Sequence, residues 1–522
     1  MTESKQQTFE RRFKLGKSQF FGVMTAQGLA LSFQDVRLKS GFSEVAPTSV
    51  SIESLFSRRV GLKSPIASAS MDTLTMSRIA IAMAMSGGIG VIHRNLDPIR
   101  QAAEVASVKS HLNAMIAKPV TVRADETIEQ IENRRRDKGQ NFQSFPVIDH
   151  EGRLVGLLTR SDFLMCDDTS LTAAQIMTRE VVTAPGGTDI SRAHDVMKTH
   201  KKKVLPLLNN DGRVVGMYVF SDVKRIRTGS HDSYNTDGMG HLRVGAAIGI
   251  GEDALERAIL LIREAVDVIV IDTAHGDSKP VYETLKALRQ YRDVEKVDIV
   301  VGNVSEGKSA MRLADAGADG IKVGQGPGSI CTTRIIAGIG CPQVTAIYNC
   351  TAAIAGSGVP ICADGGIEYS GDIPIAIGAG AHSVMLGKLL AGTDETPGEL
   401  VTIGGVPHKS YRGMGSLGAM QDSAASRDRY KETNVDKDRL VPEGVEAVVP
   451  YQGPVSGVLH QLVEGLRRGM GYVGAATIEE LREKGDFHRI SAAGLNESHP
   501  HGVLITRDAP NYPNTSSNRK EV

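Results

Sequence analysis

The segment "VDIVVGNVSEGKSAMRLADAGADGIKVGQG", Val297–Gly326, holds the structural unit on which the fold prediction depends. An apolar, β-branched run stands at each end, "VDIVVGNV" and "ADGIKVGQG", and a helical pattern covers Gly307–Ala316 between them. Parallel neighbouring strands need a crossover connection, which is most often a helix. The segment therefore predicts a β-strand, an α-helix and a second, parallel β-strand.

Six more runs of this kind occur in the chain: "KSPIASAS", "GGIGVIHR", "HLRVGAAIGI", "VDVIVIDTAH", "VPICADGGI" and "AHSVMLGK". Helical patterns such as "MSRIAIAMAMS" and Asp253–Glu264 separate most neighbours. Eight strands buried on both faces and connected by helices predict an α/β fold, a closed parallel (βα)8 TIM barrel. An open, doubly wound sheet is the alternative. Polar loops follow many different strands rather than one switch point, and this favours the barrel.

The composition excludes several classes of protein. The 522 residues include 60 Lys and Arg against 60 Asp and Glu, so no overall positive charge attracts nucleic acid or an anionic membrane. There is no apolar run of about 18 residues to predict a membrane span, and the N-terminus lacks a signal-peptide pattern. Five cysteines without CxxC spacing argue against a disulfide framework or a zinc site. We expect a cytoplasmic protein with no nucleic-acid or membrane partner.

An internal repeat interrupts the predicted barrel between its second and third strands. "FPVIDHEGRLVGLLTRSDF" and "LPLLNNDGRVVGMYVFSDV" align with each other, and Gly152 corresponds to Gly212. A repeat inserted in a barrel loop predicts a separate module. The pattern resembles a tandem pair of cystathionine-β-synthase-type (CBS) domains, which implies binding of purine nucleotides such as ATP or GTP. Asp162 and Asp222 occupy the positions where that family holds a ribose; a purely structural insert is the alternative.

Glycine-rich loops follow the last two predicted strands, in "CADGGIEYSGD" and "GAHSVMLGK". Glycines at these positions let backbone N–H groups approach a phosphate, as they often do at the ends of the last two strands of a barrel. Asp364, which stands beside the glycine pair, is suited to accept hydrogen bonds from both hydroxyls of a ribose. Phosphate and ribose together predict a nucleotide ligand.

The Cys loop, "GQGPGSICTTR" at Gly324–Arg334, follows the sixth strand and therefore puts Cys331 at the catalytic end of the barrel. Its glycine spacing is not the GxGxxG fingerprint of dinucleotide-binding folds. A thiol among loop dipoles and near an arginine is a candidate nucleophile. Three other cysteines lie in apolar runs and suit the alternative, a small buried hydrophobe: Cys341, Cys350 and Cys362.

Motifs over nearly the whole chain resemble the IMP dehydrogenase family: "SASMDTLT", "GPGSICTTRIIAGIGCPQ", "ADGGI", "YRGMGSLGAM", "DRY", "VPEGVEA" and "NESHPH". The resemblance implies oxidation of inosine monophosphate (IMP) to xanthosine monophosphate (XMP) with NAD, the committed step of guanine nucleotide biosynthesis. It also implies a TIM-barrel homotetramer that can pair into octamers. The implied domains are a first part of the barrel at 1–114, the CBS pair at 115–230 (units 115–175 and 176–230) and the rest of the barrel at 231–522.

The resemblance assigns a role to each matching residue. Cys331 attacks C2 of the base to form a covalent thioimidate, and Thr333, Arg429 and Tyr430 serve its hydrolysis. The implied IMP site consists of Met71, Ser329, Asp364, Gly365, Gly366, Gly387, Lys388, Tyr411, Arg412, Gly413, Met414, Gly415 and Glu443; Lys388 stands where the family commonly has Ser. The implied NAD contacts are Asp272, Asn303, Gly324, Gln325 and Gly326. The implied potassium ligands are Gly326, Gly328 and Cys331, completed by Glu497, Ser498 and His499 of a neighbouring subunit.

A long segment from about Thr393 to Pro450, rich in Gly, Ser and charge, follows the eighth strand. A loop of this length is either disordered or a working lid. The resemblance gives it a purpose, because hydride transfer needs NAD in the pocket whereas hydrolysis needs water there. A mobile segment that enters after the reduced dinucleotide leaves would resolve this conflict; we call it the flap. Arg429 within it acts as a base only if it is desolvated, since the pKa of arginine exceeds about 12.

Two other functions remain open at this point. GMP reductase is a related barrel that uses the same cysteine and NADPH to deaminate GMP, but it lacks a long flap with an Arg-Tyr pair. A nucleotide-sensing scaffold with a catalytically silent barrel is the second alternative. The presence of Cys331, Thr333 and Arg429 argues against the scaffold.

Overall fold

The computed structural model describes residues 16–111, 115–116, 119–137, 144–227, 233–291, 296–430, 436, 439–507 and 509–512. The chain forms two compact units, one of residues 1–109 and 234–522 and the other of residues 110–233. The domain boundaries expected at 114 and 230 both lie outside the described residues. None of the helices in the described part of the chain combines the length and apolar character that crossing a membrane requires.

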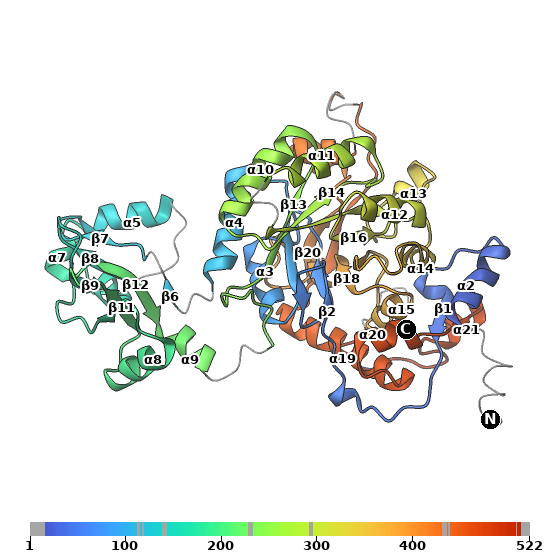
Figure 1. Ribbon diagram of the computed structural model, residues 1–522, viewed down its shortest axis with the longest axis horizontal. Helices are drawn as coiled ribbons and strands as arrows, with labels where there is room; N and C mark the ends of the chain where they lie inside the picture. Colours follow the sequence, from blue (N-terminus) through green and yellow to red (C-terminus); the bar gives the residue numbers. More distant parts are fainter. Residues whose placement is uncertain are drawn as a thin grey trace. The chain divides into compact units, whose positions relative to one another are not determined.

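Eight parallel strands close into a barrel in the first unit (Figure 1). Their order around the barrel is β13 (Val244–Ile248), β14 (Val268–Asp272), β15 (Asp298–Val304), β16 (Gly320–Val323), β17 (Ile361–Asp364), β18 (Ser383–Leu386), β4 (Ile66–Ser68) and β5 (Ile89–Ile92). Each strand coincides with one of the eight runs expected from the sequence. Pairing of Val384 on β18 with Ile66 on β4 belongs to the closed ring. The predicted barrel is confirmed, and the open-sheet alternative is wrong.

The barrel strands are apolar along their length because both of their faces are covered. Every residue of β13, β14, β15 and β16 is buried. The covering helices include α3 (Ser77–Met85), α10 (Gly251–Arg263), α11 (Lys279–Arg289), α12 (Gly307–Asp315), α14 (Gln343–Ala353) and α15 (Asp372–Gly378) (Figure 1). Helix α12 ends one residue before its predicted end and buries Ala310 and Leu313. The predicted strand–helix–strand unit is thus confirmed.

Segments on either side of the barrel sequence meet beside the cavity described below. β1 (Val36–Leu38) pairs antiparallel with β22 (Phe487–Arg489), although most of the chain separates them. Helices α19 (Val455–Val473) and α20 (Ile478–Lys484) lead from the flap to β22, and α21 (Ala492–Glu497) follows it. As a result, Phe33 from the N-terminal side and His499 from the C-terminal side line the same cavity.

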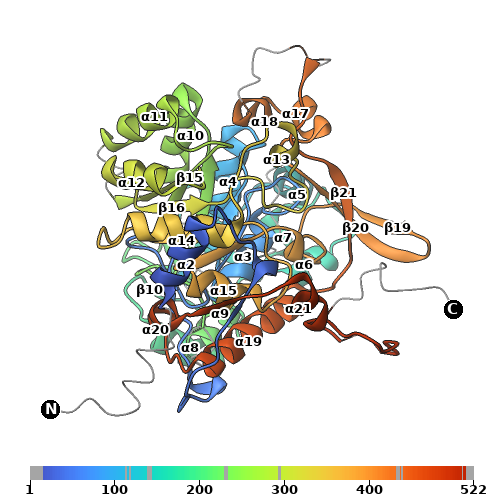
Figure 2. The same ribbon diagram turned by 90° about the vertical axis from the view of Figure 1, so that its right-hand side faces the viewer.

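The flap contains regular structure in its described part. Strands β19 (Leu400–Ile403), β20 (Val406–Arg412) and β21 (Glu446–Pro450) form an antiparallel sheet that projects beyond the barrel in Figure 2. Two short helices, α17 (Leu417–Asp422) and α18 (Ala424–Arg429), come after β20, and the side chains of Ser416 and Ser423 cap their N-termini. Of the two states expected for this segment, the described residues adopt the ordered one.

The second unit contains the sequence repeat as two similar hairpins. β8 (Phe145–Ile148) pairs with β9 (Leu154–Leu158), and β11 (Val204–Leu208) pairs with β12 (Val214–Val219). The register shifts at the last two residues of β8 and at the corresponding two of β11. Each hairpin has its own apolar core, one around Phe145 and one around Leu205. The other elements are β6 (Met115–Ile116), β7 (Val122–Arg123), α5 (Ile128–Asp137), α6 (Arg160–Leu164), α7 (Ala173–Ile176), β10 (Ala184–Pro185), α8 (Ile190–Thr199) and α9 (Phe220–Arg227).

Candidate active site

A cavity of about 430 Å³ lies at the carboxyl ends of the barrel strands. Asp272 and Asp364, the last residues of β14 and β17, line it, as do Asn303 within β15 and the loops that follow β16 and β18. The predicted site residues that line this cavity are Met71, Asp272, Asn303, Gly324, Gln325, Gly326, Gly328, Ser329, Cys331, Thr333, Asp364, Gly365, Gly366, Gly387, Lys388, Tyr411, Gly413, Met414, Arg429, Tyr430, Glu443 and His499. Sequence reasoning thus selected residues that the fold brings to one cavity, although His499, which was expected from a neighbouring subunit, lines it from the same chain.

Cys331 stands at one end of a hydrogen-bonded chain of side chains. Its thiol donates to Thr333 Oγ1 over 3.2 Å, and the Thr333 hydroxyl donates to Glu443 Oε2 over 2.6 Å. Glu443 belongs to the flap, 110 residues from Thr333 along the chain. A nucleophilic thiol therefore has a proton path to a carboxylate.

Backbone pairing with the flap holds the Cys loop in place. Ile330 accepts a hydrogen bond from the N–H of Val445, and Thr332 donates one to the carbonyl of Glu443. Arg334, which we expected near the thiol, lies within electrostatic reach of Cys331 and donates to the carbonyls of Gln325 and Cys341. It therefore braces the base of the loop by bonding its backbone.

The other cysteines differ from Cys331 in burial and contacts. Burial raises the pKa of Cys341 to about 11 and that of Cys362 to about 12. Burial also raises the pKa of Cys350. Such thiols stay protonated near neutral pH and are poor nucleophiles. Of these four, only Cys331 lines the cavity.

The glycine-rich loops after β17 and β18 form a crowded end of the cavity. A Cβ added to Gly387 would lie 2.5 Å from the hydroxyl of Tyr411, so any larger residue there would clash. Tyr411 is 4% exposed, and burial raises its pKa, which keeps its hydroxyl a neutral donor. Lys388 is exposed at the start of α16 (Lys388–Ala391). Backbone donors, a phenol and an ammonium group together suit a phosphate.

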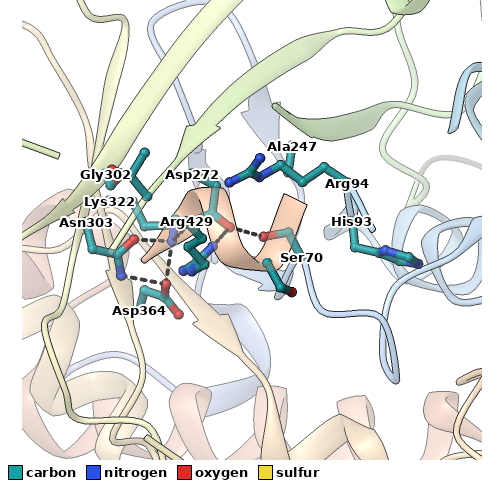
Figure 3. A network of polar contacts seen from close by, with 12 residues as sticks. Ser70, His93, Arg94, Ala247, Asp272, Gly302, Asn303, Lys322, Asp364 and Arg429 are labelled. Carbon is teal, nitrogen blue, oxygen red and sulfur yellow. Dashed lines mark hydrogen bonds and ion pairs between the residues drawn. The ribbon is translucent and has the colours of Figure 1, made fainter. Parts of the chain in front are cut away.

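Carboxylates and cations form a buried network on the other side of the cavity (Figure 3). Asp272 is 2% exposed; it accepts a 2.7 Å hydrogen bond from Ser70 and forms an ion pair with Arg429 of the flap. Asp364 Oδ2 lies 2.6 Å from Lys322 Nζ and 2.9 Å from Asn303 Nδ2. Burial disfavours the charge on Asp272, but attraction to Arg429 and Lys322 holds its pKa below the ordinary value.

The loop after β5 contacts the flap helix that carries Arg429. Arg94 Nη1 donates to Asp428 Oδ2 over 2.9 Å, and Asn95 Nδ2 donates to Ser426 Oγ over 2.9 Å. The pKa of Arg429 is raised above the ordinary value, because the carboxylate of Asp272 outweighs the cost of burial. The flap therefore lies over the cavity with its arginine charged and held in place.

Tyr430, next in the chain, packs its ring against the flap backbone. A Cβ at Gly415 would lie 2.5 Å from the ring of Tyr430. Burial raises the pKa of Tyr430 to about 12, against the opposing effect of the Arg429 cation. Its hydroxyl is therefore protonated near neutral pH and available as a hydrogen-bond donor.

Four predicted site residues do not line the cavity: Arg412, Gly415, Glu497 and Ser498. Arg412 turns its guanidinium to Asp72, with a 2.7 Å ion pair, and to Asp422 of the flap. Its observed role is thus to tie α17 to the barrel. Ser498 donates its hydroxyl to the carbonyl of Gly494 at the end of α21.

Sequence reasoning missed three buried polar residues beside the site. Lys322 has a 1% exposed side chain between the two carboxylates, and Gln343 donates to the carbonyls of Val323 and Asp364. Arg94 holds the flap. A lysine inside the fully buried strand β16 was the available signal, because an isolated charge is costly to bury without partners.

Comparisons with known proteins agree with this geometry. The family described as "IMP dehydrogenase / GMP reductase domain" matches residues 30–501. Inosine-5'-monophosphate dehydrogenase of Aquifex aeolicus is 47% identical over 92% of this chain and 97% of its own length. The protein of the same name from Mycobacterium tuberculosis is 46% identical over 93% of this chain and 92% of its own.

A solved structure also resembles this chain closely. GMP reductase from Trypanosoma brucei, in complex with guanosine 5'-monophosphate, superposes with a TM-score of 0.82 and 38% sequence identity. The match covers 91% of this chain and 98% of that one. The two relatives and the solved structure are thus all enzymes that are named after a purine nucleotide.

Proposed function

The chain belongs to the IMP dehydrogenase / GMP reductase family, and we propose that it oxidises IMP to XMP with NAD as hydride acceptor and water as the source of oxygen. It is an oxidoreductase that acts on a purine nucleotide. The single observation that carries the proposal is the hydrogen-bonded chain from Cys331 through Thr333 to Glu443, in a cavity that Arg429 of the flap covers. The cavity, of about 430 Å³, is large enough for a nucleotide.

The side chains provide each chemical step. Cys331 Sγ adds to C2 of the hypoxanthine ring while the thiol proton leaves through Thr333 and Glu443. C2 then loses a hydride, which oxidises the ring by two electrons and leaves a thioimidate. Water attacks the same carbon and the C–S bond breaks. One proton of the water returns to the sulfur, the other ends on the ring, and XMP is released.

The flap residues serve the hydrolytic half of the reaction. Arg429 and Tyr430 both line the cavity and are partly buried, so a water molecule beside them would be oriented by fixed donors. The Cys331–Thr333–Glu443 chain provides a second route for a proton. Asp364 and the glycine loops hold ribose and phosphate during both halves.

The residues expected to contact NAD lie together and fit a polar ligand. Asp272, Asn303 and the segment Gly324–Gly326 line one cavity, and Asp272 Oδ1, which accepts no hydrogen bond from the described residues, is paired with the Lys322 ammonium at 2.9 Å. When bound, NAD supplies the acceptor for the hydride. Arg429 takes the Asp272 carboxylate in the present conformation, so the docked flap and a dinucleotide at Asp272 exclude each other.

Backbone carbonyls of Gly326, Gly328 and Cys331 fit a potassium ion in chemistry, because hard monovalent cations prefer oxygen donors. The carbonyl of Gly328 already accepts the N–H of Cys331 over 3.0 Å and keeps a second lone pair. The remaining ligands in this proposal are Glu497, Ser498 and His499 of a neighbouring subunit in a homotetramer. Two measurements test this part of the proposal. Activity should require potassium, and the mass of the protein in solution should be that of a tetramer.

The second unit is proposed to bind purine nucleotides. Its repeated hairpins support a CBS pair, and Asp162 follows the first hairpin at the start of α6, where its carboxylate accepts from Thr159. Calorimetric titration with ATP, and separately with GTP, tests the binding. Loss of one binding event in Asp162→Ala, with the barrel's activity intact, is the expected result.

GMP reduction is the second candidate, because a GMP reductase is among the structural relatives. The docked Arg429–Tyr430 pair favours hydrolysis of a thioimidate and therefore IMP oxidation. The deciding experiment incubates the purified protein with IMP and NAD, and separately with GMP and NADPH, while absorbance at the nicotinamide band is followed. We expect NADH to form in the first reaction; consumption of NADPH in the second alone would reverse the assignment.

A further inference from the structure

Lys322 is a buried cation to which the sequence comparison assigned no role. It lies on β16, and its side chain is 1% exposed. Its ammonium group has three partners: Asp364 Oδ2 at 2.6 Å, Asp272 Oδ1 at 2.9 Å and the side-chain carbonyl of Asn303 (Figure 3). Asn303 and Asp364 accept hydrogen bonds from the ammonium group, whereas Asp272 Oδ1 contacts it as an ion pair.

The two carboxylates that meet at Lys322 belong to different parts of the site. Asp364 stands at the end of β17 beside the glycine pair, where the ribose is expected. Asp272 stands at the end of β14 and receives Arg429 of the flap. Lys322 therefore connects the part of the cavity that is expected to hold the ribose with the part that receives the flap.

We propose that Lys322 is a positioning residue that fixes the direction of the Asp364 and Asp272 carboxylates, and that it thereby couples ribose binding to docking of the flap. This inference rests on the proposed function and adds a residue to it. Two neighbouring carboxylates without a cation between them repel each other, and the buried Asp272 is in addition costly to desolvate. With Lys322 present, each carboxylate keeps an oxygen directed at the ammonium and one edge for its other partner.

The surroundings of Asp272 determine how the site responds to loss of the ammonium. The charged groups that face this part of the cavity come from four elements or loops: Lys322 on β16, Asp364 on β17, Asp428 and Arg429 on α18, and Arg94 after β5. When the flap lifts, Arg429 and Asp428 leave together. Lys322 is then the cation in direct contact with both remaining carboxylates.

Loss of that cation makes docking of the flap depend on pH. Asp272 would then lie buried without its ammonium partner and would take up a proton at a higher pH than it does in the wild type. Protonated Asp272 cannot form the ion pair with Arg429, so acid would release the flap. At higher pH Asp272 ionises again, and Arg429 docks without repulsion from a neighbouring ammonium group. The wild-type enzyme keeps Asp272 ionised throughout this range, because Lys322 and Arg429 lower its pKa.

Trypsin provides a readout that needs no substrate. The side chain of Arg429 is 15% exposed when it is docked, so cleavage after Arg429 reports undocking of the flap. Cleavage rates at pH 6.0 and 8.5 are measured by mass spectrometry and normalised to a free peptide of the flap sequence. The variants are Lys322→Met, Lys322→Gln and Lys322→Arg, with Lys308→Met on the exposed face of α12 as the matched control.

In Lys322→Met we expect the normalised rate of trypsin cleavage after Arg429 to be at least tenfold higher at pH 6.0 than at pH 8.5. Wild type, Lys322→Arg and Lys308→Met should change by less than twofold. Lys322→Gln retains two N–H donors but no charge, and its cleavage rate should depend on pH as that of Lys322→Met does. If Lys322→Met does not fold, Lys322→Gln takes its place in the test. A folded Lys322→Met or Lys322→Gln protein with the same protection at both pH values would overturn the proposal.

A second arm tests the coupling to the ligand. Calorimetry at pH 7.5 should give a dissociation constant for IMP at least tenfold higher in Lys322→Met than in Lys308→Met, and Lys322→Arg should recover most of the difference. If the rate of cleavage after Arg429 changes in Lys322→Met but the dissociation constant for IMP does not, ribose binding and docking of the flap are not coupled through Lys322. If no protein binds IMP, wild type included, this result contradicts the proposed function. The trypsin experiment would still show whether Lys322 controls docking of the flap.

Discussion

Arg429 on the flap helix α18 and Asp272 at the end of β14 form a buried ion pair, although 157 residues separate them in the chain. The pair joins the flap helix to the end of a barrel strand. Asp272 also has a 2.7 Å hydrogen bond from Ser70, which fixes the direction of the carboxylate. The position of the arginine over the cavity is therefore set by the rigid barrel rather than by the flap alone.

Removing the guanidinium separates the two halves of the reaction. In Arg429→Ala we expect hydride transfer to stay within about threefold of wild type and hydrolysis to fall by about 10² or more, the usual contribution of a proton-transfer group. Stopped-flow absorbance should show a burst of NADH near one per subunit, followed by a slow phase. Arg468→Ala, on the exposed face of α19, is the control. Equal slowing of both phases would remove Arg429 from the hydrolytic step.

The threonine between Cys331 and Glu443 is expected to carry a proton. Thr333→Val keeps the shape of the side chain but breaks both hydrogen bonds of the chain. We expect kcat to fall by about 10²-fold with little change in KM for IMP. Thr333→Ser restores a hydroxyl and should recover most of the rate. If valine and serine variants have the same kcat, the relay is not used.

Arg94 is expected to act as a latch for the flap. Arg94→Met removes the 2.9 Å ion pair to Asp428 while keeping an apolar side chain of similar length. Undocking should increase trypsin cleavage after Arg429 about tenfold and slow hydrolysis more than hydride transfer. Arg100→Met, exposed on α4 (Pro98–Ser110), is the matched control. Unchanged cleavage in Arg94→Met would show that the latch contributes nothing.

A partly buried histidine away from the cavity, His382, is expected to make the stability of the protein depend on pH. His382 Nδ1 accepts the N–H of Ile361 over 3.1 Å, and burial lowers the pKa of His382 to about 3. The unfolded chain, with a pKa of about 6.5, binds the proton first as pH falls. The free energy of unfolding should therefore fall below pH 6.5 by about 1.4 kcal/mol per pH unit from this group.

Calorimetry at pH 7.5, 6.0 and 5.0 measures this effect as a falling midpoint of thermal unfolding. His382→Gln retains an acceptor for Ile361 but does not titrate, so its midpoint should fall less than that of wild type. The exposed His488→Gln should behave as wild type does. An identical pH dependence in all three proteins would show that His382 is not held neutral.

The barrel was predictable because its signal is local. Each strand is a short apolar run, and the polar residues of the site stand at strand ends, where the topology brings them together. The Cys loop could be identified for the same reason. Side-chain direction was not predictable in the same way: Arg412 neighbours Tyr411 in sequence, yet it turns away from the cavity to Asp72.

Lys322 and Arg94 were not predictable because their roles depend on partners far along the chain. Lys322 contacts Asp364 across 42 residues, and Arg94 contacts Asp428 across 334. No spacing rule connects such pairs before the fold is known. A charged residue within a buried strand marks a position that needs partners, but the sequence does not identify them.

The covalent bond between Cys331 and the purine ring is the central claim, and mass spectrometry of the intact protein tests it most directly. Wild type is mixed with IMP and NAD and quenched in acid within one turnover. We predict an adduct of one nucleotide per subunit, mapped to Cys331, present in Cys166→Ala and absent in Cys331→Ala. NADH formed by wild type without any adduct on Cys331, or formed equally by Cys331→Ala, would contradict the account.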